Sequence, residues 1–142
     1  EMTLVAAVAR IFHPGIKYDH MLVIEGRQRM GKSLCINILG KKWFSEISLV
    51  DKDKDTVGKM MGKWILEVGE MEVLKKKEIE SIKAFITTQS DRVRLPYQRT
   101  TKDFPRQNIF IGTINPDGKG YFMDSTGNTR FFPVLAHKCD IQ

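Results

Sequence analysis

The sequence has few cysteines and no long hydrophobic run, and both absences narrow its class. Its two cysteines, Cys35 and Cys139, allow one disulfide at most and match no metal-binding spacing. This usage favours a reducing cytoplasm. The longest N-terminal apolar run, residues 4–9, stops at Arg10, well short of the ~18 residues that a membrane span needs. Because Glu1 precedes it, the run is also a poor signal peptide, and we expect a cytoplasmic protein without a membrane partner.

The length and charge indicate one globular domain with a basic second half. The 142 residues are 42% hydrophobic and 28% charged, which is typical of a single folded domain. Residues 75–142 carry twelve lysines and arginines against seven acidic residues, whereas the first 74 residues are nearly balanced. Such an excess suggests a polyanionic partner, although a solvated charged face would look the same. We expect one domain over residues 1–142, part of a longer protein because no methionine precedes Glu1.

Apolar patterning predicts helices and strands that alternate along the chain. Helices are expected at residues 4–12, 31–39, 57–61 and 79–86, and strands at residues 21–24, 64–68, 108–113 and 131–134. Pro133 indicates that the last strand lies at a sheet edge or ends there. Cys35 falls on the apolar face of its helix and is expected in the core. The order predicts an α/β domain with a mostly parallel sheet.

One motif points to nucleotide chemistry. Residues 26–33 fit G-x-x-x-x-G-K-[ST], between a predicted buried strand and an apolar-faced helix. Backbone N–H groups of such a loop, together with the helix N-terminus, bind phosphate oxygens. A glycine-rich turn with a solvated lysine is the alternative, which the flanking pattern disfavours. The candidate nucleotide-binding residues are Gly26, Arg27, Gln28, Arg29, Met30, Gly31, Lys32, Ser33 and Leu34.

Polar residues follow two predicted strands and are candidates for hydrolysis. Lys32 would bind the β and γ phosphates of ATP, and Ser33 and Glu67 would hold Mg²⁺. Glu70 follows the same strand as Glu67 and is our candidate base for the attacking water. Asn115 could orient that water or the γ-phosphate, although an Asn before proline also favours a simple turn.

Basic residues form two further candidate sites. A stretch from residue 89 to 106 is basic, and its residues suit a loop that follows a nucleic-acid backbone while one aromatic stacks a base. An ordinary charged loop is the alternative. The candidates in this stretch are Arg92, Arg94, Tyr97, Arg99, Lys102 and Arg106. Arg130 could complete a neighbouring subunit's active site as an arginine finger, or it could be a plain surface residue.

The motifs together resemble the virulence-associated protein E family of phage, prophage and mobile-element replication proteins. The resemblance spans nearly the whole chain, with the motifs in the family's order. It rests on residues 13–33, Lys63–Glu70, Ile82–Phe85, Asp91–Tyr97, Phe104–Gln107 and Gly127–Val134. The family is similar to superfamily 3 helicases, which form rings, commonly hexamers, and move on DNA.

The resemblance implies a fold and residue roles. It implies a three-layer P-loop NTPase domain, AAA+ or superfamily 3 helicase-like, from a longer replication protein. The stretch from Lys83 to Tyr97 falls where such helicases place a DNA-contacting hairpin. Asn115 matches the sensor position, and Arg130 the arginine finger, with Arg106 as the alternative. Arg29 departs from the family's usual glycine, which puts the affinity of the loop in question, and only Arg130 remains of a usual arginine pair.

The leading hypothesis is therefore a DNA-dependent ATPase, the motor of a replication helicase, with ATP and Mg²⁺ as cofactors. Its expected partners are single-stranded or forked DNA and further copies of itself in a ring. Two alternatives stay open at this point. One is a small nucleotide or metabolite kinase, and the other is a slow nucleotide-dependent switch that binds DNA.

Overall fold

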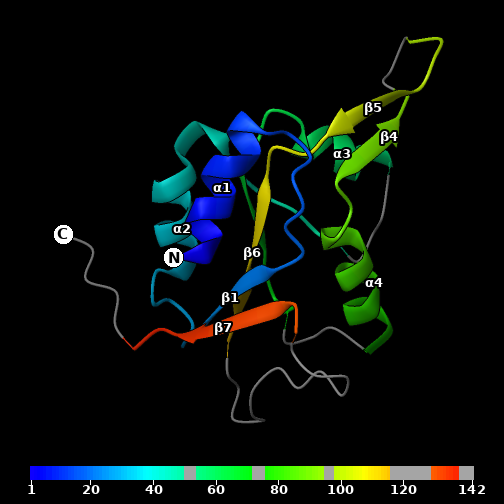
Figure 1. The fold of residues 1–142 in the computed structure, drawn as a ribbon. Helices are drawn as coiled ribbons and strands as arrows, with labels where there is room; N and C mark the ends of the chain where they lie inside the picture. Colours follow the sequence, from blue (N-terminus) through cyan, green and yellow to red (C-terminus); the bar gives the residue numbers. More distant parts are fainter. Residues whose placement is uncertain (50–53, 72–75, 95–97, 116–128, 138–142) are drawn as a thin grey trace.

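Five parallel strands form the central sheet of the protein (Figure 1). The structure, a computed structural model, describes residues 1–49, 54–71, 76–94, 98–115 and 129–137. The strands are β1 (Met21–Glu25), β2 (Phe44–Glu46), β3 (Ile65–Val68), β6 (Ile109–Ile114) and β7 (Phe131–Leu135). Their order across the sheet is β2-β3-β6-β1-β7, and every neighbouring pair is parallel. The α/β class and the parallel sheet are confirmed, as is the edge position of β7.

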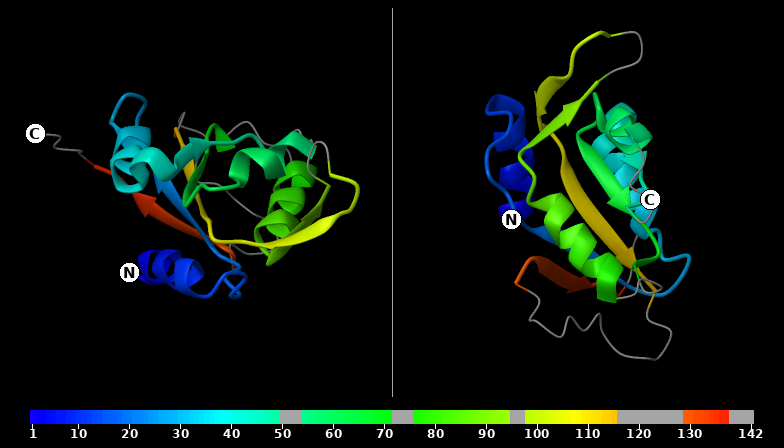
Figure 2. Two further views of the ribbon diagram at one scale, coloured as in Figure 1. Left: turned by 90° about the horizontal axis from the view of Figure 1, so that it is seen from above. Right: turned by 90° about the vertical axis from the view of Figure 1, so that its right-hand side faces the viewer.

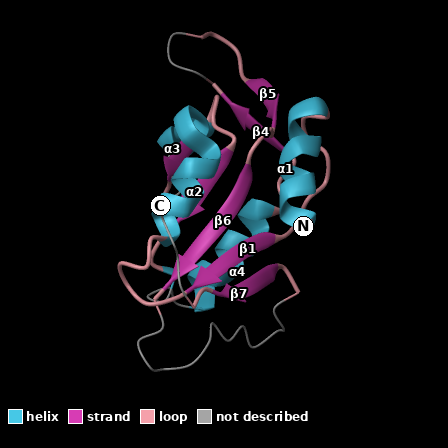
Figure 3. Ribbon diagram, turned by 90° about the vertical axis from the view of Figure 1, so that its left-hand side faces the viewer, coloured by secondary structure: helices cyan, strands magenta, loops and turns pink. Residues whose placement is uncertain are grey.

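Helices cover both faces of this sheet. They are α1 (Met2–Phe12), α2 (Lys32–Gly40), the short 3-10 helix η1 (Lys41–Trp43), α3 (Lys54–Met60) and α4 (Lys76–Ile86). Ala7 of α1 and Ile36 of α2 pack on one face, whereas Met60 of α3 and Ile82 of α4 pack on the other. Figure 3 looks onto the α1 and α2 side, with α4 behind the strands. The four helices that the sequence predicts are all present.

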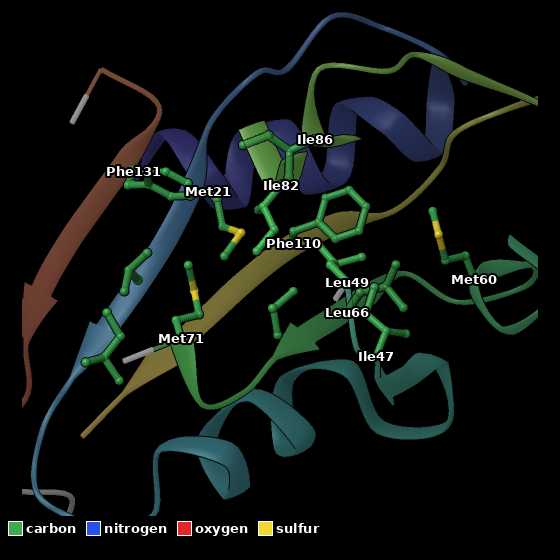
Figure 4. Close-up of a cluster of buried hydrophobic side chains, with 13 residues drawn as sticks. Met21, Ile47, Leu49, Met60, Leu66, Met71, Ile82, Ile86, Phe110 and Phe131 are labelled. Carbon is green, nitrogen blue, oxygen red and sulfur yellow. The ribbon is translucent and has the colours of Figure 1, made fainter. Parts of the chain in front are cut away.

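The larger core cluster lies between the sheet and α4 (Figure 4). Leu66 of β3 and Phe110 of β6 are fully buried there against Ile82 and Ile86. Both central strands are buried on both faces, so their sequences are nearly continuous apolar runs. Gly112 leaves room for the methionines that pack on these strands, because a Cβ there would overlap the Met71 sulfur unless that side chain shifted.

The helix α1 turns its apolar stripe to solvent, which the sequence did not predict. Val5 and Phe12 are 63% and 75% exposed, and the buried positions are Thr3, Ala7 and Arg10. Arg10 explains this orientation, since its guanidinium donates to the carbonyl oxygens of Ile16, Tyr18 and Asn108. These charge-assisted bonds hold the polar side of α1 against the sheet. The exposed apolar residues of the helix are Met2, Leu4, Val5, Val8, Ile11 and Phe12.

The helix α2 shows the same reversal. Ile36 and Gly40 face the sheet, and Gly40 lies so close that a Cβ there would come within 2.9 Å of the Phe44 Cβ. Cys35 is exposed instead, so the core position expected for it was wrong. The side of α2 that packs on the sheet includes Gly40, whereas the larger apolar side chains of Leu34, Ile38 and Leu39 are exposed.

Burial shifts the pKa of two groups beneath α1. Desolvation lowers the pKa of the Arg10 guanidinium, and the nearby Arg106 charge lowers it further. Desolvation also raises the pKa of Tyr18, whose hydroxyl donates to Thr3 Oγ1 at 3.0 Å. These two residues tie the N-terminal helix to the segment that enters β1.

A two-stranded antiparallel hairpin projects from the sheet. Its strands are β4 (Ser90–Val93) and β5 (Lys102–Pro105), and it extends away from the helices at the upper right of Figure 1 and the top of the right view in Figure 2. Because β5 leads directly into the start of β6, the hairpin rises from the amino edge of the sheet. Apolar patterning predicted only a basic stretch here and missed both strands, as it also missed β2. The hairpin that the resemblance implies begins at Lys83, whereas β4 begins at Ser90.

Candidate functional site

The glycine loop, residues 26–31, connects the carboxyl end of β1 to the start of α2. Gly31 takes a left-handed conformation (φ 81°) at the N-cap of α2, and Arg29 is also left-handed at φ 65°. Gly26 packs against Ala136, where a Cβ would lie 3.2 Å from its carbonyl oxygen. The loop lies outside the carboxyl ends of parallel strands, which is where open α/β sheets bind ligands.

Lys32 is buried at the first turn of α2 and gathers three oxygens around its ammonium group. Nζ donates to the Gly26 carbonyl at 2.5 Å, to the Arg27 carbonyl at 3.0 Å and to Asn115 Oδ1 at 2.8 Å. Asn115 follows the end of β6, so the contact joins two elements that are 83 residues apart. The structure thus brings the predicted lysine and the predicted sensor residue together.

Ser33 and Glu67 meet directly beside this lysine. The Ser33 hydroxyl donates to Glu67 Oε1 at 2.7 Å, and the Thr113 hydroxyl donates to the same oxygen at 2.9 Å. Strand alternation explains the meeting: Glu67 and Thr113 fall on the face of β3 and β6 that α2 covers. The two residues predicted to share a metal ion are therefore in contact.

The carboxylate of Glu67 has an unused oxygen. Glu67 is 2% exposed, and Oε2 has no hydrogen-bond partner among the described residues. A buried, unpaired carboxylate oxygen is costly unless something binds it. A serine hydroxyl and a carboxylate are the oxygen ligands that Mg²⁺ prefers, so these residues fit that ion. The described residues hold no cluster of three or more His, Cys, Asp or Glu side chains.

Glu70 lies apart from this group. It is exposed two residues beyond β3, with a left-handed backbone (φ 52°). Within the described part of the chain it makes no hydrogen bond or ion pair, and its role as the base stays a prediction.

Arg130 lies at the amino ends of the strands, at the end of the sheet opposite the glycine loop. It precedes β7, and its carbonyl accepts from the Met21 N–H at 2.8 Å at the start of β1. The glycine loop follows the end of β1, a strand length of roughly 16 Å away. Arg130 therefore cannot reach its own chain's glycine loop, and its role as an arginine finger for another subunit stays a prediction.

The basic residues of the hairpin divide into exposed and buried sets. Arg92, Arg94, Arg99 and Lys102 are exposed, and Arg92 lies 3.9 Å from Asp103 across the hairpin. Tyr97 lies outside the described residues. These exposed arginines and lysine remain candidates for nucleic-acid contact.

Two residues predicted to bind nucleic acid, Lys83 and Arg106, have buried side chains in this structure, which does not favour that contact. Lys83 is 5% exposed and donates to Glu80 at 2.9 Å on its own helix. Arg106 is 2% exposed and donates to both carboxylate oxygens of Asp91, at 2.6 and 2.7 Å, and to the Phe85 carbonyl. Arg106 therefore anchors the hairpin to α4, and its guanidinium is already engaged by Asp91 and Phe85, which favours Arg130 over Arg106 as the candidate arginine finger.

Sequence reasoning missed Thr113 as a site residue. The available signal was its position, two residues before Asn115 at the end of an apolar strand. A polar side chain in such a strand must find a partner when it is buried. Glu67 is that partner.

Comparisons with known proteins agree with this architecture. The profile of a protein family described as "Virulence-associated protein E-like domain" matches residues 1–142. No curated protein matches the chain. Within the described residues, no helix has the length and apolar character of a membrane span.

Two solved structures share the fold. "The A form apo structure of NrS-1 C terminal region-CTR" superposes with a TM-score of 0.61 at 19% identity over 94% of this chain. "The A form apo structure of NrS-1 C terminal region-CTR(305-718)" gives a TM-score of 0.62 at 17% identity over 96% of this chain. This chain covers 33% of each of those chains, so it spans about a third of the length of the structures that it matches.

Proposed function

The chain belongs to the virulence-associated protein E-like family, and from this premise we propose that it is the ATP-binding and ATP-hydrolysing motor domain of a replication helicase of phage or mobile-element origin. The observation that carries the proposal is the convergence of Lys32, Asn115, Ser33 and Glu67 beside one glycine loop. Two pairs predicted from separate motifs meet there. A glycine-rich turn without function would not need them.

The glycine loop would bind the phosphates of ATP. Its backbone N–H groups and the N-terminus of α2 supply partial positive charge. Lys32 is held near this position by carbonyl oxygens of the loop and by Asn115. A phosphate oxygen would attract the ammonium group more strongly than a neutral carbonyl does, because the hydrogen bond would join two charges. Asn115 would keep the lysine aimed and could contact the γ-phosphate.

Ser33 and Glu67 would hold Mg²⁺ between them and the phosphates. Bound there, the ion would neutralise charge that develops on the transferred phosphoryl group. Glu67 would use Oε2, while Thr113 keeps the carboxylate oriented through Oε1. Glu70 would accept the proton of the attacking water.

Hydrolysis would be completed by a second copy of the chain. Arg130 lies at the end of the sheet opposite its own glycine loop, so it would act as an arginine finger for a neighbour in a ring. The exposed basic residues of the hairpin would contact single-stranded or forked DNA through its phosphates.

ATPase activity per molecule, measured against protein concentration with and without single-stranded DNA, tests this proposal. We expect the activity to rise with concentration and with DNA, and to fall by at least about a hundredfold in Arg130→Ala, because an arginine finger supplies a large part of transition-state stabilisation. Arg130→Ala should still bind ATP, since the residue is remote from its own glycine loop.

Lys17→Ala is the matched control for the loss of a positive charge. Lys17 is 71% exposed and, among the described residues, forms an ion pair with Asp19 alone, at 3.3 Å, so its variant should hydrolyse ATP as the wild type does. Activity that is flat with concentration and indifferent to DNA and to Arg130 would refute the motor. Transfer of phosphate to a small acceptor in place of water would support the kinase alternative.

A further inference from the structure

A cavity lies at the amino ends of the strands, at the end of the sheet opposite the glycine loop. Its volume is about 610 Å³, within the range of small-molecule sites. The residues that precede β3 and β6 form its floor, α3 and the end of α1 form its sides, and the base of the hairpin closes it. The proposed ATP site would lie a strand length away, so the two are separate.

Three aromatic side chains contribute to the lining of this cavity. Both tryptophans of the chain, Trp43 and Trp64, line it together with Phe104 of the hairpin. Trp43 is 48% exposed, which is unusual for so large an apolar side chain. Flat aromatic faces of this kind stack the bases of single-stranded nucleic acid, whatever the sequence.

The floor of the cavity also holds an unsatisfied polar group. Asn108 lines the cavity and is 5% exposed, and its Oδ1 accepts no hydrogen bond among the described residues. Its Nδ2 donates to the Met60 carbonyl at 3.5 Å. A buried amide oxygen without a donor calls for a partner. An amino or imino N–H of a nucleobase is a donor of the required kind.

The surroundings of the cavity are basic. Lys63 lines it, and Lys42 lies with its Nζ 4.5 Å from the Trp43 ring centroid. Asp91, the acidic residue in the lining, is neutralised by Arg106. The exposed Arg92 and Lys102 belong to the hairpin that closes the cavity. An apolar, aromatic interior with a positive rim is complementary to a base on a phosphate backbone.

We propose that this cavity is a base-binding pocket, in which one nucleobase of a single strand stacks on Trp43 and donates to Asn108 while its phosphates contact the hairpin. The inference rests on the proposed DNA contact and makes it more specific. It places a base at the junction of hairpin and sheet, next to the Asp91–Arg106 pair that anchors the hairpin. Movement of the hairpin would then be coupled to capture or release of a base.

Binding of two labelled oligomers of equal length tests the pocket: a single-stranded oligodeoxyadenylate, and a deoxyribose-phosphate oligomer without bases. Anisotropy gives each affinity, and intrinsic fluorescence reports on the cavity because both tryptophans line it. We expect the base-carrying oligomer to bind about tenfold tighter and to quench the fluorescence. Trp43→Ala should remove most of this difference, whereas Arg92→Ala should weaken both oligomers alike.

Each other outcome overturns the inference in a different way. Equal affinities without quenching would remove the pocket but leave the hairpin as a DNA contact. Failure of both oligomers to bind a protein that still binds ATP would remove the DNA contact as well. In the third outcome, the two probes bind with equal affinity while Trp43→Ala dissociates an assembly of the protein itself, as seen by sedimentation. That result would show that the cavity holds a polypeptide segment of another subunit.

Discussion

Replacing one partner of the Arg106–Asp91 ion pair should lower the free energy of unfolding more than most single substitutions in the protein do. The Arg106 side chain is 1% exposed and that of Asp91 is 11% exposed, and the two form a bidentate pair at 2.6 and 2.7 Å. The guanidinium also donates to the Phe85 carbonyl at 2.6 Å and stacks on the Phe85 ring, 4.3 Å from its centroid. It thereby joins the hairpin, α4 and the entry to β6.

The cost of each substitution follows from burial. Asp91→Ala leaves a buried guanidinium without its counter-ion, which we expect to lower the free energy of unfolding by about 3–5 kcal/mol. Arg106→Met leaves the Asp91 carboxylate unpaired and removes one of the two donors to the Phe85 carbonyl, which keeps the Thr88 N–H, and we expect a loss of similar size. The double variant leaves no lone charge, so it should lose about 2–3 kcal/mol less than the sum of the two.

The same hairpin offers a matched control. Arg92 and Asp103 are also an Arg–Asp pair, but they are 73% and 65% exposed and 3.9 Å apart. Arg92→Ala should therefore change the stability by no more than about 0.5 kcal/mol. Urea unfolding followed by tryptophan fluorescence measures all four variants. A loss below about 1 kcal/mol in both Asp91→Ala and Arg106→Met would refute the structural role of Arg106.

Three further predictions concern stability and the site. Arg10→Met removes a buried guanidinium together with its three hydrogen bonds to carbonyl oxygens. The free energy of unfolding, measured by thermal unfolding, should fall by about 3 kcal/mol or more, and an unchanged Tm would contradict the anchoring of α1. Arg29 is left-handed, so Arg29→Val should be less stable than Arg29→Gly by at least about 1 kcal/mol in urea unfolding, and equal stabilities would show that the loop takes another conformation. Thr113→Val should weaken the apparent Mg²⁺ affinity in nucleotide titrations by about tenfold, and no change would separate Thr113 from the metal site.

Much of the fold could be predicted because its central strands are buried on both faces. Nearly continuous apolar runs of four to six residues that end in Val68 and Ile114 favour central strands of a covered sheet. The strand β2 was missed because it has only three residues, and the hairpin because its exposed strands carry no apolar alternation. The exposure of the apolar residues of α1 could not be predicted from their helical periodicity. Arg10 decides the orientation of that helix through three carbonyl oxygens, two of them just beyond the helix and the third, that of Asn108, 98 residues away.

The candidate site was predictable where a motif has fixed spacing and unpredictable where tertiary contacts decide. Lys32 and Ser33 follow from the glycine loop, and Glu67 from its place at the end of a strand. Thr113 depends on the register of β3 against β6, which no local pattern encodes. Arg106 looks like its exposed basic neighbours in sequence, and only burial against Asp91 separates it from them.

The most direct test of the account is ATP binding with and without Mg²⁺, measured by calorimetry on the wild type, Lys32→Met and Glu67→Gln. We predict saturable binding that Mg²⁺ tightens in the wild type. Lys32→Met should weaken binding by at least about tenfold, because it removes a charge-assisted contact to phosphate. Glu67→Gln should bind ATP yet lose most of the response to Mg²⁺. Absence of saturable binding in the wild type, or variants that bind as it does, would contradict the proposed ATP site.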